Sequence, residues 1–159
     1  MPDVTVVMLH GMGNQGTSFW KKRTPFLEEA LERRRIDARF VEITYADIAM
    51  DAADDYWDAI KDKPTTKADF LRKPFIESFA DAGVYGYRPE LPDSNYRRVH
   101  KRIQDGMETA MINLSDGERI VIRAQSLGCH IVSNYLYDLA NGTGSHAAGG
   151  LPVVEGLRD

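Results

Sequence analysis

Residues 118–140, ERIVIRAQSLGCHIVSNYLYDLA, join a strand pattern, a serine and a helix pattern without a break. Residues 118–125 are rich in isoleucine and valine, which predicts a buried strand. After the serine, apolar residues recur at helical spacing, at Leu127, Ile131, Tyr135, Leu136 and Leu139. Asn141-Gly142 is a typical helix end. We therefore expect a strand that runs directly into an amphipathic helix, with Ser126 at the junction.

The junction itself has the pattern small-x-Ser-x-small, formed by Ala124, Gln125, Ser126, Leu127 and Gly128. A nucleophilic serine held on a sharp strand-to-helix turn needs small residues two positions before and two after it, because the turn leaves no room for larger ones. Ala124 and Gly128 meet that need. The alternative is an ordinary serine that caps the helix.

The rest of the chain also alternates strands with helices. Val4 to Leu9 is a nearly continuous apolar run, which indicates a strand covered on both faces. Thr24-Pro25 is a typical helix start, and residues 38–48 form a second strand pattern. Ser94 precedes a helix pattern that Asp116-Gly117 closes. This order predicts one α/β domain over residues 1–159, in three α/β/α layers, with a parallel sheet whose middle strand begins at Val4. Residues 49–92 form a helical insert, which is equally well interpreted as a lid over the substrate or as a structural cap.

The stretch LHGMGNQG, residues 9–16, admits two interpretations. Its glycines spell G-x-G-x-x-G after a strand, which is the pattern of a dinucleotide-binding turn. That turn needs a helix starting inside the motif and an acidic residue about 20 positions later, whereas Glu42 and Asp47 lie too far along. The same loop can instead present backbone N–H groups to an oxyanion beside a nucleophilic serine. The second interpretation accounts for both glycine motifs together.

With these two motifs the chain resembles the α/β-hydrolase superfamily, and within it bacterial esterase- or lipase-type proteins with an HGMGNQ loop and an AQSLG elbow. The resemblance spans residues 4–140, and it implies hydrolysis of a small carboxylic ester through an acyl-enzyme on Ser126, without a cofactor or a metal. It implies an oxyanion hole made by the backbone N–H groups of Met12 and Leu127. The residues expected to support the loop and the elbow are His10, Gly11, Gly13, Ala124, Gln125 and Gly128. Arg123 departs from the pattern, since that strand position is usually apolar.

The mechanism of this superfamily also needs an acid and a histidine, and the sequence offers poor candidates. We expect His10 to brace its loop, His130 to pack on its own helix, and His100 to lie on the preceding helix. His146 falls in NGTGSHAAGG, residues 141–150, which we interpret as a flexible loop, and we expect Asp138 at the surface. We therefore expect the chain to be the N-terminal half of a hydrolase that lacks its acid and histidine, with weak activity or none.

Composition narrows the remaining function classes. A net charge of −4, with short basic runs on predicted helix faces, argues against a nucleic-acid partner. The one cysteine, Cys129, excludes an internal disulfide, and the first apolar run is too short for a membrane span, so we expect a cytoplasmic protein. The alternative to an enzyme is a non-catalytic half-domain or interaction protein that pairs with another chain. In either case, an open sheet edge along residues 120–122 is expected to favour self-association.

Overall fold

The structure is a computed structural model, and it describes residues 2–11, 20, 24–48, 85, 86, 89, 91–112 and 114–147. Most of the expected insert at 49–92 lies outside this part of the chain. At the centre is a parallel sheet of three strands in the order β2-β1-β3. The strands are β1 (Val4–Leu9), β2 (Ala38–Ile43) and β3 (Arg119–Ala124). The predicted parallel pairing, with β1 in the middle, is confirmed.

The second strand is shorter than expected. It ends at Ile43, whereas the sequence pattern extends to Ile48. The backbone N–H of Tyr45 donates to the side chain of His10, 3.1 Å away, and not to a neighbouring strand. Residues 46–48 then form a helical turn. The sheet ladder therefore stops where the chain begins to make side-chain contacts with the end of β1.

The alternation of side chains along the strands divides the core in two. In the register, Val7 lies between Val41 of β2 and Ile122 of β3. These residues face the larger cluster, which includes Ile103, Met107, Ile131 and Tyr135 from two helices. Val6 and Met8 face the other way, toward Phe40, Trp20 and Leu27. The described sheet therefore has helices on both faces, as an α/β protein requires.

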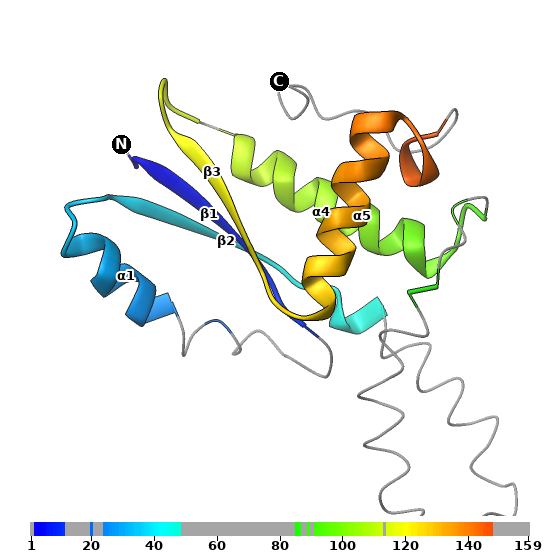
Figure 1. The fold of residues 1–159 in the computed structure, drawn as a ribbon, viewed down its shortest axis with the longest axis horizontal. Coiled ribbons are helices and arrows are strands. Elements are labelled where there is room, and N and C mark those ends of the chain that lie inside the picture. The colour runs from blue at the N-terminus through cyan, green and yellow to red at the C-terminus, as the bar shows by residue number, and fades with distance from the viewer. Residues whose placement is uncertain are drawn as a thin grey trace, which may run out of the picture.

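Figure 1 shows α1 (Thr24–Glu32) on one side of the sheet, and α4 (Asn95–Met111) and α5 (Leu127–Asn141) on the other. The predicted cap of α4 is confirmed, since the Ser94 side chain accepts the Arg97 N–H at 3.3 Å. The predicted end of α5 is also confirmed, with Gly142 left-handed at φ 61°. However, α4 ends at Met111, ahead of the expected Asp116-Gly117.

An arginine from β2 explains the early end of α4. Arg39 donates to the backbone carbonyl groups of Ala110 and Ile112, which satisfies acceptors that the last turn of a helix leaves open. Its Nε also donates to the Thr5 hydroxyl at 3.0 Å, and that hydroxyl donates to Glu118. The arginine thus connects β2, β1, the end of α4 and the residue before β3 at the amino end of the sheet.

The prediction of a flexible loop at residues 141–150 is wrong for the middle of that range. Residues Gly144–His146 form a short 3-10 helix, η1, and the side chains of Ser145 and His146 are buried. The reason is the carboxylate of Asp138, which accepts hydrogen bonds from the backbone and the hydroxyl of Ser145. Asp138 itself is buried, so the expectation of a surface residue is also wrong.

Candidate functional site

Ser126 lies between β3 and α5 and has a backbone conformation that a serine rarely adopts. Its φ is 51° and its ψ is −122°, and its side chain makes no capping hydrogen bond with α5. The sharp turn expected at this serine is confirmed, and its backbone is strained, because a non-glycine residue in such a region costs of the order of 1–3 kcal/mol. The residue is exposed. The serine is therefore held outward at the carboxyl end of a parallel sheet, where α/β proteins place their sites.

Gly128 explains why the turn tolerates no larger side chain two positions after the serine. A Cβ at Gly128 would lie 2.4 Å from the carbonyl oxygen of His10 and 3.4 Å from Leu9 Cβ. The first turn of α5 therefore rests directly on the end of β1. The backbone is packed almost as closely at Gly11. A Cβ there would lie 3.0 Å from Ser126 Cβ and 3.1 Å from the Gln125 carbonyl oxygen.

Two of the first three backbone N–H groups of α5 donate hydrogen bonds within the turn. The Gly128 N–H donates to the Gln125 carbonyl and the Cys129 N–H to the Ser126 carbonyl, each at 2.9 Å. In the described part of the chain, the N–H of Leu127 has no acceptor. An N–H group at the first position of a helix is an anion donor. Met12, expected as the other donor of the oxyanion hole, and Gly13, expected to support the loop, lie outside the described residues.

His10 braces its loop by hydrogen bonds, as expected. Its Nε2 accepts the Tyr45 N–H, and its Nδ1 lies 2.7 Å from the carbonyl oxygen of Gly11. The rings of His10 and Tyr45 are stacked, with centroids 4.2 Å apart, and both side chains are fully buried. Because both ring nitrogens are engaged with the backbone, His10 is a structural residue and not a base for Ser126. Sequence reasoning did not find Tyr45, although its place just beyond β2, beside the end of β1, is a signal for it.

A second group of residues with the chemistry of a catalytic triad lies at the other end of α5. His100 Nδ1 is 2.5 Å from the Ser145 hydroxyl, which donates to Asp138 Oδ2 at 3.1 Å. Asp138 is twelve positions after Ser126 along the helix, which is about 18 Å along the axis. Figure 1 shows η1 at the end of α5 that is remote from the β3–α5 turn. His100, His146 and Asp138 therefore do not reach Ser126.

The hydrogen bonds of this second group form one directed chain. Tyr96 and Ser145 both donate to Asp138, so His100 Nδ1 donates to Ser145 and its Nε2 accepts from the Tyr85 hydroxyl at 2.7 Å. In a catalytic triad the histidine stands between acid and serine, whereas here the serine stands between acid and histidine. Burial lowers the pKa of His100 to about 3, which keeps the ring neutral. We define these residues, Tyr85, Tyr96, His100, Asp138 and Ser145, as the buried polar cluster.

His130 contacts Asn134 of its own helix and the ring of Tyr85. Its side chain is exposed in the first turns of α5, and its Nε2 lies 3.3 Å from Asn134 Nδ2. The four histidines are all described, and none makes a hydrogen bond to the Ser126 hydroxyl. Thus the described residues supply a strained, exposed serine without a histidine base on it.

Arg123 lies on the α1 side of the sheet. Its guanidinium carbon is 5.1 Å from the centroid of the Trp20 ring, a cation–π contact. Its strand is less covered than the sequence predicted, because Val121 on the same face is 48% exposed. A groove of about 440 Å³ runs beside these residues and is lined mainly by apolar side chains, among them Val6, Leu27 and Phe40.

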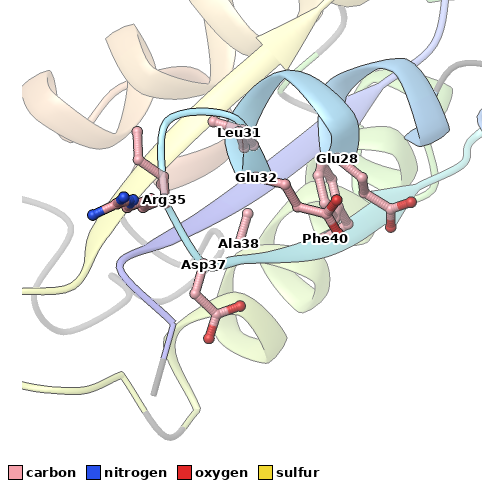
Figure 2. Close-up of a pocket in the computed structure, with 8 residues that line it drawn as sticks. Glu28, Leu31, Glu32, Arg35, Asp37, Ala38 and Phe40 are labelled. Carbon is pink, nitrogen blue, oxygen red and sulfur yellow. The ribbon is translucent and has the colours of Figure 1, made fainter.

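A further pocket of about 420 Å³ lies between α1 and the start of β2. Figure 2 shows Glu28, Leu31 and Glu32 of α1 on one side of it, with Asp37 and Ala38 on the other. Ala38 pairs with Val4, at the amino end of the sheet. The pocket is thus at the end of the sheet opposite Ser126 and is not its substrate site.

Within the described ranges, no group of three or more histidine, cysteine, aspartate or glutamate side chains could hold a metal ion. None of the described helices is long and apolar enough to cross a membrane. No known protein family, curated protein or solved structure matches the chain.

Proposed function

We propose that this chain is a serine hydrolase of the α/β-hydrolase type, in which Ser126 attacks carboxylic esters. The observation that carries the proposal is the backbone of Ser126, at φ 51° and ψ −122°, on an exposed turn between a parallel strand and a helix. Strain of this kind is retained where the surrounding structure enforces it, and it gathers at active sites. Here Gly11 and Gly128 enforce it by their close packing.

The chemistry would follow the usual two steps of acyl transfer. The Ser126 oxygen bonds to the ester carbonyl carbon, its proton passes to a base or to water, and the C–O bond to the alcohol breaks, which leaves an acyl-enzyme. Water then attacks the acyl carbon and releases the acid and the serine. The Leu127 N–H, together with an N–H of the loop after Gly11, would bind the oxygen that becomes negative.

Because no described histidine is hydrogen-bonded to the Ser126 hydroxyl, we expect a low rate of ester hydrolysis. Without a histidine base the serine hydroxyl is a weak nucleophile, and an oxyanion hole alone leaves about 10³- to 10⁴-fold over water. We therefore expect the 159-residue chain to hydrolyse activated esters slowly.

Labelling by a fluorophosphonate, followed by peptide mass mapping, tests the proposal. We expect slow labelling on Ser126, and none in the Ser126→Ala variant. Ser133→Ala is the matched control, because Ser133 is an exposed serine of the same helix. Equal labelling of the wild type and Ser126→Ala would refute the proposal.

A second candidate is a half-domain that pairs with another chain through β3. In the described sheet, β3 has a partner on one side only, and the exposed Val121 lies on it. Open apolar strand edges associate readily. Light scattering should then show concentration-dependent association that Val121→Lys reduces. A wild-type chain that stays monomeric at high concentration would contradict this candidate.

A further inference from the structure

Tyr45 is a residue to which the hydrolase resemblance assigns no role, and the role argued for it rests on the proposed function. The Tyr45 hydroxyl donates to the carbonyl oxygen of His10 at 2.7 Å and lies 3.3 Å from that of Gly11. One phenol thus engages two successive carbonyl groups at the point where β1 enters its glycine loop. Its exposed fraction is 1%.

His10 completes the arrangement. Because the Tyr45 N–H donates to Nε2, that nitrogen carries no proton, and the ring proton is on Nδ1. Nδ1 therefore donates to the Gly11 carbonyl oxygen, 2.7 Å away. The Gly11 carbonyl thus accepts a hydrogen bond from His10 and lies beside the Tyr45 hydroxyl, and the rings of these two residues are stacked.

The orientation of this peptide group matters because Gly11 faces the serine. A Cβ at Gly11 would be 3.0 Å from Ser126 Cβ. A carbonyl turned toward Ser126 would repel the oxygen that becomes negative during ester attack.

We propose that Tyr45 is a positioning residue that keeps the Gly11 carbonyl turned away from Ser126, so that no carbonyl oxygen faces the substrate oxygen when it becomes negative. Tyr45 acts together with His10, which it holds in the tautomer that donates to the same carbonyl. It touches neither the substrate nor the serine. Its effect is therefore on the rate of attack and not on substrate binding.

Tyr45→Phe tests this proposal, since it removes the hydroxyl and keeps both the ring stacking and the backbone N–H. We expect the Ser126-dependent hydrolysis of p-nitrophenyl acetate to fall roughly 10- to 100-fold in kcat, with KM within about twofold. Fluorophosphonate labelling should slow by a similar factor. Tyr137→Phe, on an exposed tyrosine of α5, is the matched control and should change neither rate.

A readout that does not need the oxyanion hole separates positioning from damage to the fold. Cys129 is exposed on the first turn of α5, and its alkylation by iodoacetamide reports on the elbow without an oxyanion. We expect the alkylation rate to be unchanged in Tyr45→Phe. His10→Phe, which keeps a stacked ring but loses the Nδ1 donor, should lower the ester rate in the same way.

The outcomes distinguish this inference from the proposed function. If Ser126→Ala leaves the wild-type rates unchanged, the proposed function fails, and the role of Tyr45 fails with it. If Ser126→Ala abolishes them while Tyr45→Phe matches the wild type, only the role of Tyr45 is refuted. If Tyr45→Phe and His10→Phe both lose the fold, the pair is simply part of the core, and the inference is again refuted.

Discussion

The two ends of α5 carry similar residue types in opposite circumstances. At its amino end Ser126 is exposed, has positive φ and makes no side-chain capping hydrogen bond. At its carboxyl end Ser145 is fully buried and hydrogen-bonded to both Asp138 and His100. A serine, a histidine and an aspartate in contact thus stabilise the fold at one end, while a lone strained serine is the candidate for chemistry at the other. Accessibility and backbone strain, and not residue types alone, distinguish the two.

The largest expected effect comes from breaking the contact that fixes the amino end. Gly128→Val places a branched side chain against the His10 carbonyl oxygen, which a Cβ alone would approach to 2.4 Å. We expect a loss of about 3 kcal/mol or more in the free energy of unfolding, measured by urea denaturation. Cys129→Val, on the next and exposed residue, should change it little. Equal stability of the two variants would show that the elbow does not rest on β1.

Removing the acid at the carboxyl end should cost about 3 kcal/mol. Asp138→Ala leaves the donors of Tyr96 and Ser145 buried without an acceptor. Asp105→Ala is the control, because Asp105 pairs with Lys101 at the surface, and such pairs contribute little. The rate of Ser126 labelling should be unchanged at temperatures where Asp138→Ala is folded. A slower rate there would indicate that the two ends of α5 are coupled.

The buried histidine predicts a dependence of stability on pH. The folded pKa of His100, about 3, lies below its usual 6.5, so the unfolded chain binds a proton that the folded chain does not. Stability should therefore fall as the pH falls from about 6.5, by up to about 1.4 kcal/mol per unit, or about 2 kcal/mol by pH 5. His100→Gln should flatten this part of the curve, whereas His130→Gln, at an exposed position, should not. Identical curves for His100→Gln and the wild type would contradict a buried neutral ring.

The smallest expected effect is a gain in the free energy of unfolding. Ser126→Gly should stabilise the chain by about 1 kcal/mol, because glycine accepts the positive φ that strains serine. Ser126→Ala also lacks the hydroxyl but keeps the Cβ, so its stability should stay near that of the wild type. Thermal unfolding of both variants separates strain from side-chain chemistry. If glycine gives no gain over alanine, the turn is not strained.

The sheet and the turn at Ser126 could be predicted from sequence because their signals are local. Runs such as Val4 to Leu9 have a strand pattern, and the small residues at positions 124 and 128 are spaced by the needs of one turn. By contrast, the end of α4 depends on Arg39, about seventy positions away in sequence, and no local pattern contains it.

The buried polar cluster was missed for a different reason. Asp138 follows Ile131 and Tyr135 at helical spacing, and His100 stands between Tyr96 and Ile103 in the same way, so both lie on the buried faces of their helices. Periodicity alone could have placed them inside. Residue type argued against it, because charged residues are seldom buried without partners. Two of those partners come from distant segments: Tyr96 is 42 positions from Asp138, and Ser145 is 45 positions from His100.

The connection that Arg39 makes bears on how the chain folds. Residues 39 and 110 meet only after β2 and α4 have come together, and the chain between them must close a long loop first. The last turn of α4 therefore gains its cation from tertiary structure, since no basic residue lies within that turn. An isolated peptide of residues 94–112 should fray at its carboxyl end, and the boundary of this helix becomes fixed only with the sheet. The carboxyl end of this helix therefore depends on tertiary contacts, whereas its amino end has a local cap in Ser94.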